Sequence, residues 1–508
     1  MKNSVLIIGL DGVSWRLLKP WINEGNLPTF SKLLKGGTEG DLRTTVPPIS
    51  CTAWTSLFTG KNPGKHGIYE YTTDLGQLIN SKSIKSAKIW QILSYYKKRC
   101  GVINVIMTYP LEKINGYMVS GVLTPSKEKI YSYPPELMSV LKKHKYEIRV
   151  EYGKRRTLPD EEYIIEKRFS FLEKLYDILE KRYNTLKELM NEDWDLFIFV
   201  FDHETAMLQH LFFDRKDIML EFFKRMDSYI KDLIKTFSIK NKNPYIFMVS
   251  DHGFSSSPTR SVNMRVWLEK NGISKDNRAL FQKIIPKIYN KLNKIHLSEL
   301  IVLFNKTKRA REFFQSKLTN SSSVYYKYPG VYIKQNKLKK DEYENLRNKL
   351  VQELKQLQDP LTHDNVFQIV EKREAIYSGN YTQFTPDIVA VPESNYHITF
   401  SYDSNNLFDD LKMHLKGKHF SDMYGIFLAY GNGIQASTIK NTSILDIFPT
   451  VLHILDVPLP KDLDGMVLKN IFKKNSYLRN KKITYSKVDV KTLQEKNNIK
   501  DILQEIKL

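Results

Sequence analysis

The sequence predicts an α/β fold built on a mainly parallel β-sheet. Four apolar runs rich in branched residues carry this prediction, at 5–10, 101–107, 196–201 and 245–250. Continuous apolar runs of this length are typical of strands that are buried on both faces, as in parallel sheets. Segments with apolar residues at helical spacing separate several of these runs, and strands that alternate with helices indicate an α/β protein.

Length and composition are consistent with a large folded chain. The 508 residues allow two to four domains, or one large core with insertions, and 41% of them are hydrophobic, which argues against global disorder. The net charge is +22, from 78 basic and 56 acidic side chains. Such an excess favours anionic partners. Because lysine is spread along the whole chain, however, we attribute most of the charge to a solvated surface.

The cysteines and the N-terminal segment indicate in which cellular compartment the protein is expected. Cys51 and Cys100 are the two cysteines, which gives no disulfide framework and no zinc-binding spacing and indicates a reducing compartment. The N-terminal apolar run of six residues is too short for the core of a signal peptide. The sequence holds no apolar stretch of about 18 residues. We therefore expect a cytoplasmic protein without a membrane span.

The first half of the chain contains an unusual serine. A helix is expected at 27–34, and the segment after it places Ser50 directly behind two prolines and an isoleucine. Proline disfavours helix in the residue before it, so the approach to Ser50 is extended. The residues that follow predict a short buried helix that ends at Gly60. Ser50 is then either an ordinary N-cap or a hydroxyl beside an anion site at the helix start.

Acidic residues follow three of the predicted strands. Asp11, Asp202 and Asp251 each stand directly at or after a strand end, and the last two are followed by histidines, His203 and His252. Ligands of open α/β sheets gather at the carboxyl ends of the strands. Carboxylate and imidazole are suitable ligands for zinc or manganese. The sequence therefore predicts a metal site at this edge of the sheet.

The chain is expected to alternate between core and inserted segments. Helices are expected at 89–96 and 443–455, a strand at 425–431, and one long amphipathic helix or two helices within 160–190. Within the second region, strands are expected at 331–333, 365–370 and 387–391, and a helix at 341–357. The predicted domains are core segments 1–125, 191–265 and 401–475, a helical insertion at 126–190, an α/β cap at 266–400 and a basic C-terminal tail at 476–508.

The segment 281–318 is strongly basic. It holds nine Lys or Arg residues against two Glu, with apolar residues between the charges at helical spacing. This pattern favours a solvated helix face over a nucleic-acid site, because no aromatic stacking platform accompanies the charges. A nucleic-acid partner is therefore not expected.

The ordered motifs resemble the type I phosphodiesterase/nucleotide pyrophosphatase branch of the alkaline phosphatase superfamily. The resemblance covers most of the chain from residue 4 to about 470 and implies a three-layer, alkaline-phosphatase-like core with an inserted α/β cap. The matching core segments are LIIGLDG (6–12), TTVPPISCTAWTSLFTGKNPGKHGI (44–68), VINVIMTYP (102–110), VSDHGF (249–254), NMRVWLEKNG (263–272), GKH (417–419) and ILDIFPTVLHILDVPLPKDLDG (444–465).

The resemblance also implies a mechanism. Asp11, Asp251 and His252 match the ligands of one metal ion, which also binds the nucleophile, and Ser50 matches the nucleophile. The implied activity is metal-dependent hydrolysis of phosphoric esters, of phosphodiester or nucleotide pyrophosphate bonds, through a phosphoseryl intermediate. The implied cofactors are two divalent ions, zinc or alternatively manganese. The implied partner is a small phosphorylated substrate such as a nucleotide or nucleotide-sugar.

The second metal site departs from the family pattern. His210 and His419 match two of its ligands, but the aspartate that the family places four residues before the first histidine is Ala206 here. Asp202 and Glu204 lie just upstream and are the candidates to replace it. A site with two imidazoles alone binds a metal ion weakly. The alternative hypothesis is therefore a degenerate member that binds a phosphorylated ligand or a protein partner without turnover.

Two further positions bear on the active site. Tyr71 falls where many nucleotide pyrophosphatases have a phosphate-binding asparagine. Cys51, beside Ser50, invites comparison with sulfatases, whose nucleophile derives from a cysteine. The sulfatase motif has proline and arginine after that cysteine, and Thr52, Ala53 and Trp54 do not fit it. We therefore retain Ser50 as the nucleophile candidate.

Overall fold

The computed structural model describes residues 2–73, 76–150, 165–274, 323–334 and 338–486. The basic segment 281–318 and the residues after 486 lie outside the described residues. The chain divides into two compact units. The first comprises 1–256, 378–382 and 414–508, and the second 257–377 and 383–413, so the second unit covers a similar part of the chain to the expected cap at 266–400.

The first unit is built on a nine-stranded sheet. Its order is β18-β2-β17-β7-β1-β6-β3-β4-β5. The five strands from β7 to β4 run parallel, and antiparallel pairings join β17 to β7 and to β2, and β5 to β4. The prediction of a mainly parallel sheet is therefore confirmed. The strand bounds are β1 Ser4–Leu10, β2 Thr38–Arg43, β3 Cys100–Val105, β4 Gly116–Ser120, β5 Ser132–Tyr133, β6 Leu196–Phe201, β7 Pro244–Val249, β17 Tyr424–Tyr430 and β18 Ser437–Ser443.

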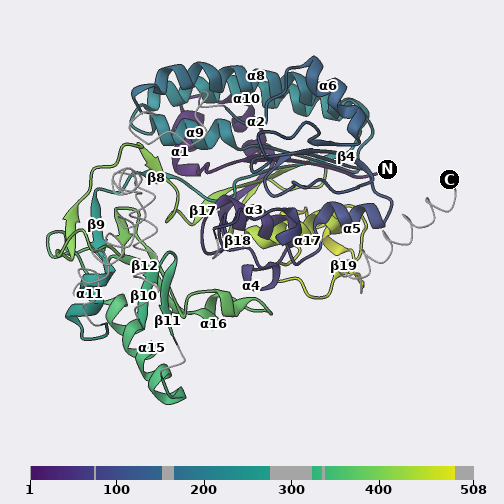
Figure 1. Ribbon diagram of the computed structural model, residues 1–508. Helices are drawn as coiled ribbons and strands as arrows, with labels where there is room; N and C mark the ends of the chain where they lie inside the picture. The colour runs from purple at the N-terminus through teal and green to yellow at the C-terminus, as the bar shows by residue number, and fades with distance from the viewer. Residues whose placement is uncertain (1, 74–75, 151–164, 275–322, 335–337, 487–508) are drawn as a thin grey trace, which may run out of the picture. The chain divides into compact units, whose positions relative to one another are not determined.

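Helices cover both faces of this sheet and give three layers (Figure 1). Alternate side chains of β1 divide between two cores: Val5 and Ile7 belong to one, and Leu6 and Ile8 to the other. Such division is expected when successive side chains point to opposite faces. One face carries α1 Trp15–Asn23, α2 Pro28–Gly36, α6 Met138–Lys143, α8 Arg168–Met190, α9 His203–Phe212 and α10 Lys216–Lys240, and the other α3 Ser50–Thr59, α5 Ile89–Tyr95 and α17 Ile447–Ile454.

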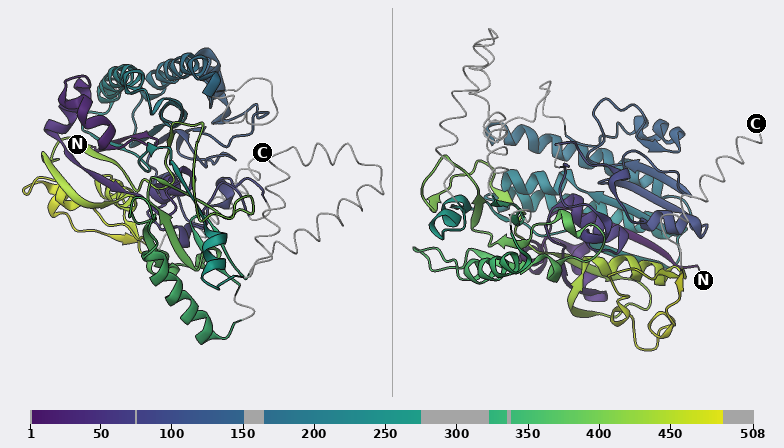
Figure 2. Two further views of the ribbon diagram at one scale, coloured as in Figure 1. Left: turned by 90° about the vertical axis from the view of Figure 1, so that its left-hand side faces the viewer. Right: turned by 60° about the horizontal axis from the view of Figure 1, so that its bottom comes forward.

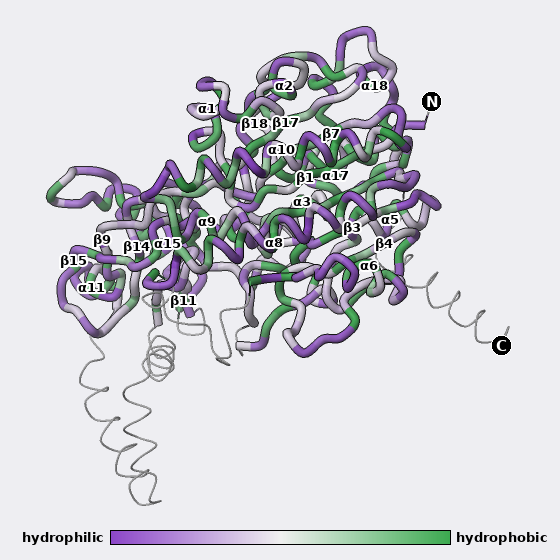
Figure 3. Tube along the Cα trace, turned by 90° about the horizontal axis from the view of Figure 1, so that it is seen from above, coloured by the Kyte–Doolittle hydropathy of each residue, from purple (hydrophilic) through white to green (hydrophobic). Residues whose placement is uncertain are grey.

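The two long helices α8 and α10 lie side by side on the sheet (Figure 2). Hydrophobic and hydrophilic residues alternate along both of them (Figure 3), as expected for amphipathic helices with one buried face. The rings of Tyr183 and Tyr229 stack between the helices at 4.0 Å. The predicted insertion at 126–190 thus contributes a helix to the layer that covers the sheet, and α8 runs unbroken from Arg168 to Met190, after a turn at Lys167.

The second unit has its own sheet and core. Its four-stranded antiparallel sheet has the order β10-β11-β13-β12, and a separate hydrophobic cluster contains residues from this sheet and α15. The strands and the helix expected in this region are confirmed. Their bounds are β10 Val324–Lys327, β11 Gly330–Ile333, β12 Phe367–Lys372, β13 Ile388–Pro392 and α15 Lys340–Lys355. Among the described helices of the whole chain, none has the length and apolarity needed to cross a bilayer.

Candidate active site

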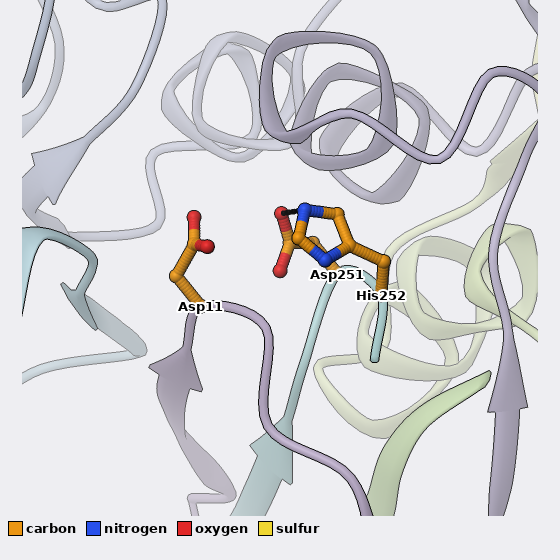
Figure 4. A group of neighbouring side chains, drawn as sticks. All are labelled: Asp11, Asp251 and His252. Atoms are coloured by element: carbon orange, nitrogen blue, oxygen red, sulfur yellow. Dashed lines mark ion pairs between the residues drawn. The ribbon is translucent and has the colours of Figure 1, made fainter. Parts of the chain in front are cut away.

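Two neighbouring strands bring the first set of predicted ligands together. Strands β1 and β7 pair in parallel with Gly9 opposite Val249, so Asp11 and Asp251 emerge level with each other at the carboxyl edge. His252 follows Asp251, and all three side chains are buried. One ligand atom from each residue lies within 4.8 Å of the others. Figure 4 shows the two carboxylates and the imidazole facing a common space.

The electrostatics of this group favour a cation. Burial raises the pKa of Asp11 well above its ordinary value, and the nearby carboxylates of Asp251 and Asp202 raise it further. Burial also raises the pKa of Asp251. Desolvated carboxylates that repel one another are stabilised in their charged form by a positive charge between them.

The orientation of His252 points to the same conclusion. Its Nδ1 lies 3.0 Å from the carbonyl oxygen of Gly253 and donates to it, so Nε2 carries the lone pair. That Nε2 lies 3.2 Å from Asp251 Oδ2, a buried oxygen that finds no hydrogen-bond donor among the described residues. Two lone pairs that face each other fit a shared divalent cation, so Asp11, Asp251 and His252 fit the first implied metal ion.

Ser50 lies beside this group at the start of α3. Its Oγ donates to His252 Nε2 at 3.2 Å, and the side chain is buried. Of the two alternatives for Ser50, the N-cap is wrong, because the extended N-cap residue is Ile49 and Ser50 is the first helical residue. The helix therefore begins one residue earlier than an N-cap at Ser50 would require. The predicted helix end at Gly60, with φ of 65°, is confirmed.

His210 and His419 form a second, adjacent group. The His419 ring stacks on that of His252 at 4.3 Å, and the centroids of His210 and His419 lie 5.7 Å apart. His210 Nδ1 lies 2.8 Å from the carbonyl of Gly417, and His419 Nδ1 lies 3.3 Å from that of Pro48. Burial and the neighbouring His252 and His210 lower the pKa of His419 well below its ordinary value, so its imidazole is neutral at pH 7.

Asp202 and Glu204 each pair with an arginine through one oxygen, whereas Asp202 Oδ2 and Glu204 Oε1 have no hydrogen-bond donor among the described residues. Both are buried, and Arg182 of α8 donates to both carboxylates from Nη1. Asp202 also accepts hydrogen bonds from Asn104 Nδ2 at 2.8 Å and from the backbone N–H of His203 at 2.6 Å. With two imidazoles and Ala206, the described residues of this second group do not fit a second metal ion.

Tyr71 and Cys51 also border Ser50. Burial raises the pKa of Tyr71 well above its ordinary value, nearby Cys51 and Asp11 raise it further, and the neighbouring Ser50 opposes this. Tyr71 is therefore a neutral phenol next to the hydroxyl. Burial raises the pKa of Cys51 to about 12, so its thiol stays protonated at neutral pH and is a poor nucleophile.

Arg182 is the residue that the sequence-based predictions missed. It lies four residues after Ile178 and four before Leu186, both buried on the inner face of α8. An arginine on the apolar stripe of an amphipathic helix requires buried anionic partners. The position of Arg182 in the sequence therefore indicates buried ion pairs, but it does not show that Asp202 and Glu204 are the partners.

The comparisons with known proteins decide the family. The model of the type I phosphodiesterase/nucleotide pyrophosphatase family matches residues 5–422, most of the 508 residues. The chain belongs to this family. It is thus a member of the alkaline phosphatase superfamily, a superfamily of phosphoester hydrolases that use divalent metals, and the predicted resemblance is confirmed. A search of the curated proteins finds no match.

Solved structures share the fold at low sequence identity. Phosphonoacetate hydrolase from Sinorhizobium meliloti 1021, solved with phosphonoacetate, matches with a TM-score of 0.55 and 13% identity over 90% of this chain and 96% of that one. Human ectonucleotide pyrophosphatase/phosphodiesterase 5 matches at 0.50 and 15%, over 89% and 95%. A mutant of the alkaline phosphatase PafA matches at 0.50 and 15%, over 92% and 99%. The predicted alkaline-phosphatase-like fold is confirmed.

Proposed function

We propose that this chain is a metal-dependent hydrolase of phosphoric esters with Ser50 as its nucleophile. The observation that carries the proposal is the buried Ser50 hydroxyl at 3.2 Å from His252 Nε2, beside the group formed by Asp11, Asp251 and His252. A hydroxyl in this position lies next to the charge that activates it.

The residues divide the chemistry between them. Asp11, Asp251 and His252 would hold a divalent ion, which would supply positive charge that favours the Ser50 alkoxide and stabilises the transferring phosphoryl group. Ser50 gives its proton to water, its oxygen attacks phosphorus in line, and the ester oxygen leaves with its bonding electrons and takes a proton from water. The second step is attack of water on the phosphoseryl group, which returns the hydroxyl to Ser50.

The proposed substrates are phosphodiesters or nucleotide pyrophosphates. Family membership supports this class, and the structural neighbour from S. meliloti was solved with a small phosphonate, phosphonoacetate. The net charge of +22 favours anionic ligands of this kind. We propose zinc as the ion, because carboxylate and imidazole suit it, with manganese as the alternative.

Ala206 supports a second candidate function. A degenerate family member would bind a phosphorylated ligand or a protein partner without turnover. The two candidates differ in turnover of esters, since both retain the fold and the group around Asp11.

Hydrolysis of p-nitrophenyl phosphate and bis-p-nitrophenyl phosphate, measured with zinc and with manganese, tests the proposal. We expect turnover by the wild type and by Cys51→Ala, the matched change at the neighbouring position, and none above background by Ser50→Ala. Binding of an unhydrolysed ester by both wild type and Ser50→Ala, without turnover by either on a broader ester panel, would favour the degenerate member.

A further inference from the structure

The second group of ligands offers two nitrogen atoms. Because Nδ1 of His210 and of His419 each faces a backbone carbonyl, the Nε2 of each imidazole carries the lone pair. Catalytic zinc sites use three protein ligands and structural sites four. In the described part of the chain, the group around Asp11 is the one set of three or more acidic, histidine or cysteine side chains close enough to share an ion.

The geometry of α9 determines which side chains could join His210. Ala206 lies one turn before His210 on the same helix face, and it ends in a methyl group. Asp202, eight residues before His210, lies about 12 Å away along the helix axis. Glu204, six residues before His210, is rotated by about 240° around the axis. Neither carboxylate therefore takes the place of a side chain at 206.

Arg182 fixes both carboxylates in their present positions. Its Nη1 donates to Asp202 at 3.1 Å and to Glu204, its Nε donates to the carbonyl oxygen of Glu147 at 3.2 Å, and its Nη2 donates to that of Ile148. The arginine is 2% exposed. Moving either carboxylate to a metal ion would remove one of the two charges that compensate this buried guanidinium, which is unfavourable.

We infer that this chain retains one divalent ion, at Asp11, Asp251 and His252, and that Arg182 withholds Asp202 and Glu204 from a second ion at His210 and His419. The inference rests on the metal-dependent function proposed above and specifies its stoichiometry. Because Ala206 occupies the position from which a carboxylate would reach the His210 ion, an aspartate there completes a three-ligand site.

Counting the metal tests this without an activity assay. The full chain is loaded with excess zinc, gel-filtered and analysed by inductively coupled plasma mass spectrometry for zinc per chain. We expect one ion for the wild type, two for Ala206→Asp, and one for Ala206→Asn, which has the same shape without the charge. Calorimetric titration of the apo-protein with zinc should show one high-affinity event in the wild type and two in Ala206→Asp.

Two control variants locate any second ion. Asp202→Asn and Glu204→Gln should each retain one ion. Two tightly held ions in the wild type would overturn the inference, and loss of one of them in either control variant would identify the carboxylate that binds it. If Ala206→Asp keeps its circular dichroism spectrum but holds one ion, the role of position 206 is refuted. A wild type that holds no ion would instead contradict the proposed metal-dependent function itself.

Discussion

The two ends of the candidate site differ in the types of ligand they offer and in the elements that carry those ligands. At one end, Asp11, Asp251 and His252 combine two carboxylates with an imidazole. At the other, His210 and His419 provide imidazoles, and the helix position next to them is Ala206. Negative ligands compensate the charge of a divalent ion, and neutral imidazoles do not. The fold can therefore retain a group suited to a divalent ion beside Ser50 without a matching group at His210 and His419.

The supporting elements differ in the same direction. The ligands of the first end leave β1 and β7, two adjacent parallel strands in the middle of a nine-stranded sheet, so their spacing is fixed by the strand register. His210 lies on α9, and His419 follows β16, a strand of two residues, Gly417–Lys418. Sites on rigid elements keep ligand geometry more precisely than sites on short connections.

The largest effect is expected from a substitution in the group formed by Asp11, Asp251 and His252. Asp251→Asn removes one negative ligand, and we expect it to abolish zinc retention and to lower kcat/KM on bis-p-nitrophenyl phosphate by about 1,000-fold. His210→Gln is the matched change at the other end and should retain its ion. Equal loss of zinc from both variants would contradict the difference between the two ends.

Changes at the second end should be milder. We expect His210→Gln and His419→Gln to keep one ion per chain and to lower kcat/KM by about 10- to 100-fold, the range found when groups that surround a metal site are replaced. Separate kcat and KM values on the same substrate would show whether the loss lies in binding or in turnover. A 1,000-fold loss together with loss of zinc would show instead that these histidines hold the essential ion.

A substitution of Tyr71 tests a neighbour of Ser50 that is not itself a candidate metal ligand. Its phenol lies near Ser50, so Tyr71→Phe removes one hydroxyl from the surroundings of Ser50 and little volume. We expect a loss of at most about tenfold in kcat/KM, the value of one hydrogen bond, with an unchanged zinc count. A loss as large as that of Ser50→Ala would make the phenol itself essential.

His66 serves as a histidine outside both ends. It is fully buried beside α3, where its ring lies 2.8 Å from Ser56 Oγ, and burial lowers its pKa to about 3. Between about 6.5 and 3 the unfolded chain binds a proton that the folded chain does not. The contribution of His66 to stability is therefore complete above about pH 6.5 and falls by up to about 1.4 kcal/mol per pH unit below it.

Urea unfolding of the wild type and of His66→Gln at several pH values measures this contribution. The free-energy difference between the two proteins should shrink as the pH falls from 6.5 towards 3. A difference that does not change with pH would show that His66 is not held neutral by burial.

The sequence was sufficient for the parts of the site that depend on a single strand end. Asp11, Asp251 and His252 each follow an apolar run, and parallel strands must bring such residues to one edge. The antiparallel pairing of β17 with its neighbours was not predictable, because its partners β2 and β7 lie far away in the chain. Periodicity marks a strand as buried but does not give its direction.

The network around Arg182 could not be predicted for a related reason. Its partners Asp202 and Glu204 lie on the loop and helix after β6, and the contacts form when α8 packs onto the same face. Likewise, the one-residue shift of the helix start at Ser50 depends on the local backbone of Ile49, and helix ends are the least certain part of any sequence-based prediction.

The most direct test of the central claim is to trap the covalent intermediate. Wild type, Cys51→Ala and Ser50→Ala are mixed with excess bis-p-nitrophenyl phosphate, quenched with acid within one turnover and analysed by peptide mass spectrometry. If Ser50 is the nucleophile, a p-nitrophenyl phosphate adduct forms on Ser50 in the first two proteins and no adduct forms in the third. Turnover without any adduct on Ser50, or an adduct on another residue, would contradict it.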